Sequence, residues 1–182
     1  MDAEAILAGE SSNGIIGSEL VYEHVHLTPR GNYLIARGLF TRIAAQLKAK
    51  NLQQTAGSSS QSGSDAPSEA DCEAWLALTN HDRQRIITEM LQRLQRPPFT
   101  NQLNHSEQLL RLSMMASSPE ENPQQTAAQY QWALRRAPDD RILHYNFGLF
   151  LFDYNRAAAA EELRRSRPWD GFPVFTPDGT PL

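Results

Sequence analysis

Two histidines end a short apolar run, in a position from which side chains can do chemistry. His24 and His26 lie two residues apart, so their imidazoles point to the same side of an extended strand. This spacing can chelate zinc, but a zinc site needs a third and usually a fourth ligand, and Glu23 would face the other way. No Cys/His cluster elsewhere supplies partners, so we expect no metal. A catalytic base at His26 and a structural histidine at a strand end remain as the alternatives.

The residues that follow indicate how His26 would be held. Thr28 can accept a hydrogen bond from a free backbone N–H of a first helical turn. Pro29 suits the first helical position because it has no N–H to lose. The sequence therefore predicts a strand, a tight turn and an amphipathic helix over residues 29–48, with His26 at the rim where α/β enzymes carry reactive groups.

Residues 14–48 resemble the last conserved block of the SGNH/GDSL hydrolases, in which an acid three residues before a histidine completes a Ser-His-Asp triad. Glu23 and His26 stand at those two places, with glutamate where the family has aspartate. The resemblance implies an α/β domain of an esterase or acyltransferase. In such an enzyme His26 would be the base and Glu23 its orienting carboxylate.

The implied mechanism also needs a serine nucleophile. Gly9-Glu10-Ser11 looks like a Gly-Asp-Ser motif, but Ser11 precedes His26 by only 15 residues. A parallel strand pair alone needs a crossover of a dozen or more residues, so we interpret these residues as a turn. We therefore expect residues 1–50 to be the C-terminal remnant of a hydrolase-like domain, with Met1 an internal start. As given, the chain should hydrolyse no ester.

Composition narrows the remaining classes. The chain has 182 residues, 40% hydrophobic and 21% charged, with a net charge of −4. This balance argues against nucleic-acid binding, which requires a concentrated basic face. Cys72 is the only cysteine, so no disulfide forms within the chain, and its apolar helix predicts a buried thiol. No apolar run has the length of a transmembrane helix or the pattern of a signal peptide, no cofactor is expected, and the compartment is left open.

A change in composition divides the chain. Residues 51–68 are rich in Gly, Ser and Gln and read as a flexible linker, an ordered surface loop being the alternative. Before it, large apolar residues recur every fourth position in the helix 29–48. The helix would either fold back on the helices that follow the linker or, with this stripe left uncovered, associate with itself. The residues that form the stripe are Ile35, Leu39, Ile43 and Leu47.

Residues 69–182 read as helices, and part of them resembles a tetratricopeptide (TPR) repeat. Thr126-x3-Tyr130-x2-Ala133 has the spacing of a second repeat helix, and Phe147-Gly148 fits the first helix of the next repeat. Ala160 stands 34 residues after Thr126, which is the repeat's period. Any helical hairpin with spaced small and large residues is the alternative. Small residues would allow close helix approach, and an earlier degenerate helix pair would span residues 83–95 and 105–116.

The fold class expected is mainly α: a TPR-like array of helical hairpins preceded by a truncated α/β remnant of strand, turn and helix. Trp132 is expected in the core, whereas Tyr145 and Asn146 are candidate partner-binding residues. His105 is expected to cap or pack at a helix start. The function expected is a protein-interaction or scaffolding module that binds a protein or peptide. The alternative is the C-terminal piece of an SGNH-type enzyme that supplies the catalytic histidine.

Overall fold

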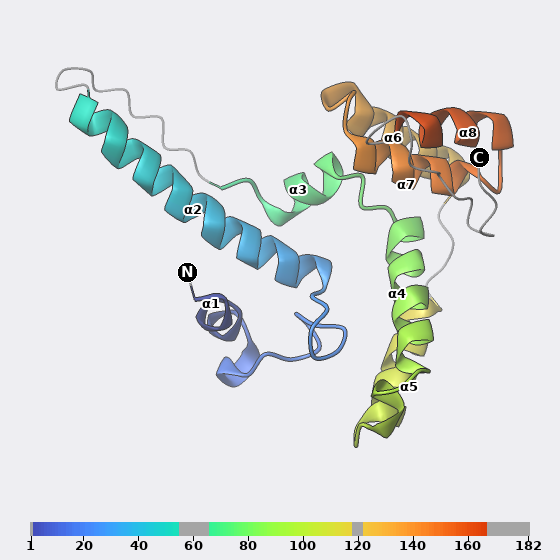
Figure 1. Cartoon of the computed structure of the whole chain (residues 1–182), viewed down its shortest axis with the longest axis horizontal. Coiled ribbons are helices and arrows are strands. Elements are labelled where there is room, and N and C mark those ends of the chain that lie inside the picture. Colours follow the sequence, from blue (N-terminus) through green and yellow to red (C-terminus); the bar gives the residue numbers. More distant parts are fainter. Residues whose placement is uncertain (1, 55–65, 118–121, 167–182) are drawn as a thin grey trace. The chain divides into compact units, whose positions relative to one another are not determined.

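The computed structural model describes residues 2–54, 66–117 and 122–166. The chain divides into two compact units, Met1–Cys72 and Glu73–Leu182, and each is described by itself. The described residues are mainly helical, which confirms the mainly α expectation (Figure 1). The predicted linker falls mostly on residues 55–65, which lie outside the described residues.

The first unit is built on one long helix. It contains α1 (Ala3–Gly9), the short 3-10 helix η1 (Ser12–Gly14), α2 (Pro29–Gln54) and most of α3 (Glu69–Trp75). Leu7, Leu20 and Leu34 form its buried centre, with Ile35 and Leu27 packed against it. The predicted helix start is confirmed: the Thr28 hydroxyl accepts from the Gly31 N–H at 3.2 Å, and the helix begins at Pro29.

The strand expected over the apolar run is wrong. Residues 21–27 form a tight loop that a single antiparallel bridge between Val21 and Leu27 closes. The Tyr22 N–H donates to the His26 carbonyl at 2.8 Å, and the Thr28 N–H donates to the Leu20 carbonyl at 2.9 Å. With no neighbouring strand among the described residues, the backbone groups of this segment pair with one another instead.

The second unit contains the C-terminal end of α3 and five further α-helices, within the part of the chain that is described. They are α4 (Asn80–Leu94), α5 (His105–Ala116), α6 (Pro123–Arg136), α7 (Arg141–Leu151) and α8 (Arg156–Arg165), with the 3-10 helix η2 (Phe99–Asn101) before α5. Side chains cap α4, α6, α7 and α8 at their first turns. The core joins α6 to α7, and its members are Ala77, Tyr130, Ala133, Leu143, Phe147 and Phe150.

Helices α7 and α8 pack together where α7 carries a glycine. A Cβ on Gly148 would lie 2.7 Å from Cγ of Leu163, so only glycine allows this approach. The small residue that α8 buries is Ala159, whereas Ala160 is exposed, so the 34-residue register is wrong by one position. The reason is local: Asn155 caps α8 at Ala158, and the inward face of the helix then falls on Ala159 and Leu163, four residues apart.

Candidate functional site

Glu23 lies at the centre of the loop that the Val21–Leu27 bridge closes. Its side chain is only 2% exposed and folds back over its own backbone. One carboxylate oxygen, Oε2, accepts from the Val25 N–H at 2.9 Å, and Oε1 accepts from the His26 N–H at 3.2 Å. These two backbone hydrogen bonds fix the direction of the carboxylate independently of the imidazoles.

Both candidate histidines meet this carboxylate. Nδ1 of His26 contacts Glu23 Oε1, and Nδ1 of His24 lies 2.8 Å from Glu23 Oε2. The expectation that Glu23 faces away from the histidines is wrong, because the chain turns here instead of running extended. The structure thus brings together the two residues of the predicted catalytic pair, Glu23 and His26.

The surroundings keep the Glu23 carboxylate ionised. Burial of this carboxyl opposes its ionisation, but hydrogen bonds from the His26 imidazole and the Val25 N–H outweigh that effect and lower the pKa of Glu23. An anion at Nδ1 fixes the imidazole tautomer and leaves Nε2 as the atom that can accept a proton. The His26 side chain is 38% exposed, so an approaching group can reach it.

The Ser11 hydroxyl does not take part in the hydrogen bonds of the Glu23–His26 pair. It donates to the Leu7 carbonyl at 2.9 Å, and among the described residues it makes no hydrogen bond with His26. The neighbouring Glu10 carboxylate binds the Arg37 guanidinium at 2.6 Å. The Gly9-Glu10-Ser11 segment therefore ends α1 and ties it to α2. Within the residues described, no group of three or more His, Cys, Asp or Glu side chains is arranged so that it could hold a metal ion.

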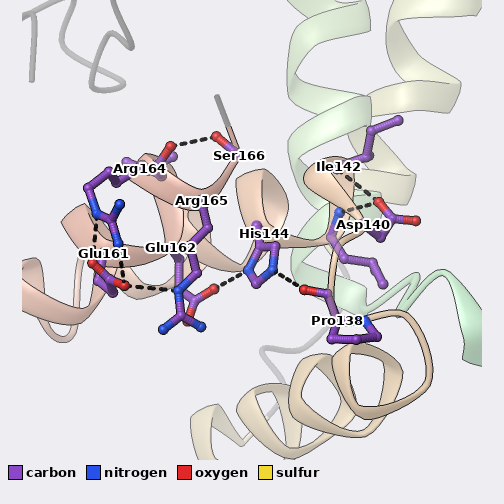
Figure 2. Close-up of polar contacts among 11 residues, drawn as sticks. Pro138, Asp140, Ile142, His144, Glu161, Glu162, Arg164, Arg165 and Ser166 are labelled. Atoms are coloured by element: carbon purple, nitrogen blue, oxygen red, sulfur yellow. Dashed lines mark hydrogen bonds and ion pairs between the residues drawn. The ribbon is translucent and has the colours of Figure 1, made fainter. Parts of the chain in front are cut away.

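A second carboxylate–imidazole pair occurs in the second unit, and the sequence analysis missed it (Figure 2). Buried His144 on α7 has Nδ1 2.5 Å from Oε2 of Glu162 on α8, and Nε2 2.8 Å from the Pro138 carbonyl oxygen. Both ring nitrogens thus face acceptors. A neutral imidazole has only one N–H, so this arrangement needs a further proton on either the ring or Glu162.

The acidic neighbour of Glu162 is engaged elsewhere. Glu161 binds the guanidinium groups of Arg164 and Arg165, and their hydrogen bonds lower the pKa of Glu161 to about 2 (Figure 2). Glu162 is therefore the carboxylate of this pair that turns to His144. The signal in the sequence is the histidine itself, because it stands among the apolar residues that α7 buries.

The candidate partner-binding residues differ in their environment. Tyr145 is 40% exposed, whereas the Asn146 side-chain oxygen accepts from the Arg85 guanidinium of α4 at 2.9 Å. The expectation that Trp132 lies in the core is wrong. Its side chain is 41% exposed, and the Arg136 guanidinium lies over its ring at 5.4 Å. The same guanidinium lies 5.1 Å from the ring centre of Trp75.

Two further residues from the sequence analysis have structural surroundings. His105 is the first residue of α5, and its N–H donates to the Gln102 carbonyl at 3.1 Å. Cys72 is partly buried, and burial together with the nearby Asp71 charge raises the pKa of its thiol, which disfavours the reactive thiolate. Neither residue belongs to the Glu23–His26 site.

Comparison with protein-family models, with curated proteins and with solved structures gave no match. Among the helices that the structure describes, none combines the length and the apolar character needed to cross a membrane. Function therefore has to be inferred from the geometry of the site.

Proposed function

We propose that the first unit carries the base and the orienting carboxylate of an SGNH-type ester hydrolase or acyltransferase. The observation that supports this proposal is the contact of a buried, backbone-anchored Glu23 with Nδ1 of a partly exposed His26. A carboxylate and an imidazole with an accessible Nε2 correspond to two of the three members of a Ser-His-Asp type triad. Glu23 reaches the imidazole although it is one methylene longer than aspartate, because the loop folds its side chain back.

The chemistry proposed for the pair is proton transfer. Nε2 of His26 takes the proton of a serine hydroxyl as the oxygen attacks the ester carbonyl carbon, and the resulting imidazolium is stabilised by Glu23. The same proton then passes from Nε2 to the leaving alcohol, and the acyl group stays on the serine oxygen. In the second step Nε2 takes the proton of water or of another acceptor hydroxyl as its oxygen attacks the acyl carbon, and returns that proton to the serine oxygen as the acyl group leaves it. No described serine hydroxyl bonds to His26, so in this proposal the serine comes from another segment of polypeptide.

The test is the activity of a form that contains the serine. An in-frame coding sequence upstream of Met1 with a Gly-Asp-Ser segment after an apolar strand would define that form. In it, His26→Ala should lower kcat by ~10³–10⁴-fold, because a triad acts as a unit. His24→Ala is the matched control and should keep most of the activity. An unchanged kcat in His26→Ala would exclude the proposed role.

The 182-residue chain gives a second measurement. Its hydrolysis of p-nitrophenyl acetate should equal that of buffer. A burst of product that both His26→Ala and Ser11→Ala abolish would identify Ser11 as the nucleophile, and the interpretation of Gly9-Glu10-Ser11 as a turn would then be wrong.

We also propose that the helices of the second unit form a protein-interaction module of TPR type. Exposed tryptophan and arginine support this role, since these residue types dominate binding energy at interfaces. Arg136 stacks on both Trp75 and Trp132, so the rings are held in place while part of each stays accessible. Trp132→Ala in the full chain should lose the partners that the wild type retains in a pull-down, whereas exposed Ile142→Ala should retain them. Equal retention by both variants would contradict the role.

A further inference from the structure

Helix α2 has an unusual charge composition. Arg30, Arg37, Arg42, Lys48 and Lys50 are all the lysines and arginines of the first 72 residues, and every one lies in α2. The helix contains no aspartate or glutamate, although the whole chain has a net charge of −4. One element of an acidic protein is thus purely cationic.

The first half of α2 illustrates how this helix is covered inside its own unit. Leu34 packs against Leu7 and Leu20. At the edges of that contact, carboxylates from outside the helix pair with its cations: Arg37 binds Glu10 at 2.6 Å, and Arg30 binds Glu69 at 2.9 Å. Inside its own unit, α2 is therefore covered by apolar side chains, and carboxylates beside them pair with its arginines.

From Leu39 onward, α2 also combines apolar side chains with cations, but its apolar side chains are exposed. The apolar stripe begins at Ile35, which packs against the buried centre, and continues onto large residues that are all more than a third exposed, namely Leu39 (45%), Phe40 (38%), Ile43 (55%) and Leu47 (56%). Beside them, Arg42, Lys48 and Lys50 form no ion pair within the described ranges, in contrast to Arg30 and Arg37.

We propose that this stripe, Leu39, Phe40, Ile43 and Leu47, docks a protein partner whose apolar helix or sheet face is bordered by carboxylates. The charges select this occupant. In a pair of α2 helices from two copies, the facing groups would carry only positive charge, which opposes the self-association predicted from the apolar pattern alone. A face bordered by Asp or Glu would instead repeat the pairing that Glu10 and Glu69 make with the first half of the helix.

The test uses the full chain and two designed helical peptides with the same leucine stripe, one flanked by glutamates and one by lysines. Fluorescence anisotropy of labelled peptide should give a Kd at least ~10-fold lower for the glutamate peptide, with a difference that shrinks in high salt. The double variant Leu39→Gln/Ile43→Gln should lose binding, and Arg42→Glu/Lys48→Glu should reverse the peptide preference. Leu110→Gln, at a position of α5 that is 64% exposed, is the matched control and should bind like wild type.

Three results would overturn the proposal. The first is weak or equal binding of the two peptides, with circular dichroism unchanged in every variant. The second is a concentration-dependent dimer in sedimentation that Leu39→Gln/Ile43→Gln abolishes, which would make a second copy the occupant. The third is co-flotation with phosphatidylserine vesicles in the absence of glutamate-peptide binding, which would assign the surface to anionic lipid.

Discussion

His144 faces two hydrogen-bond acceptors, and its side chain is buried, so water cannot replace either contact. Its imidazole joins three segments: the loop after α6 through the Pro138 carbonyl, α7 through its own backbone, and α8 through Glu162. A buried acceptor that loses its donor remains desolvated without a hydrogen bond, which destabilises the folded state. The contribution of this residue should therefore be visible in stability rather than in binding.

His144→Ala should lower the free energy of unfolding of the second unit by ~2–4 kcal/mol, because it leaves Glu162 and the Pro138 carbonyl unpaired beside a cavity. Hydrogen exchange of the α7 and α8 amides measures this loss. Ile142→Ala, two residues away on α7 and exposed, should stay within ~0.5 kcal/mol of wild type. Equal losses in both variants would mean that the imidazole contacts contribute nothing specific.

Tyr130 offers a residue-scale test with a pH direction. Burial of its phenol, then the Asp82 charge that accepts its hydrogen bond, raise the pKa of Tyr130 above its ordinary value. A phenol held neutral by folding stabilises the protein below the ordinary tyrosine range, and this contribution is lost as the pH rises from that range toward the raised pKa of the folded state. Tyr130→Phe should cost ~1–2 kcal/mol at neutral pH and flatten the alkaline loss of stability. An alkaline profile identical to wild type would contradict it.

Elements with local signals were predictable from the sequence, and elements that depend on neighbours were not. Thr28-Pro29 fixes the start of α2 through a hydrogen bond within one turn, so sequence alone located it. The helix predicted from residue 83 begins three residues earlier, at Asn80, where Thr79 caps it. The apolar run predicts a strand where residues 21–27 form a loop, because an apolar run does not say whether a second strand is present to pair with it. Helix α8 was predicted one position out of register, because its start at Asn155 decides which alanine faces α7.

The same division applies to the candidate site. The three-residue spacing of Glu23 and His26 singled out the pair, but its geometry follows from the turn and not from a strand. Glu162 lies 18 residues after His144, and the packing of α7 on α8 brings them together. That packing depends on Gly148, whose role in close approach was expected from its size.

Gly148→Ala tests the α7–α8 contact. The added Cβ would lie 2.7 Å from Cγ and 2.9 Å from Cδ2 of Leu163, a fully buried side chain with no room to swing away. The helices must separate, which should cost ~1–3 kcal/mol in the second unit. Gly9→Ala is the control, since nothing lies within 4 Å of its Cβ position. Thermal unfolding of both variants compares them, and a neutral Gly148→Ala would show that α8 is held loosely.

The loop around Glu23 gives the pH test for the first unit. Because the pKa of Glu23 is lowered on folding, its stabilising contribution is present above the ordinary carboxyl pKa of 4.5 and is lost as the pH falls below it. Glu23→Gln should remove this acid sensitivity and speed amide exchange at Val25 and His26 already at neutral pH. Glu4→Gln, on exposed α1, should change neither. Slow exchange in Glu23→Gln would mean that the backbone bridge alone holds the loop.

At the scale of the whole molecule, the two units differ in the core that supports them. The first unit buries Leu7, Leu20 and Leu34 at its centre, and each such side chain contributes about 1.5–3 kcal/mol when buried. The second unit stacks the Tyr130 and Phe147 rings at 5.0 Å and adds Phe150 and several aliphatic residues. Half of α2 rests on no described part of its own unit, so little opposes opening of the first unit.

Amides of residues 30–50 should therefore exchange faster than those of residues 124–160 in the monomeric chain, because local opening there exposes less apolar surface. Native-state hydrogen exchange with mass spectrometry measures both segments in one sample. If the glutamate-flanked peptide occupies the stripe on α2, exchange in residues 39–47 should slow while α6 and α7 stay unchanged. Equal, slow exchange of both segments without peptide would show instead that the first unit is stable without a partner, and the exposed stripe would then need another explanation.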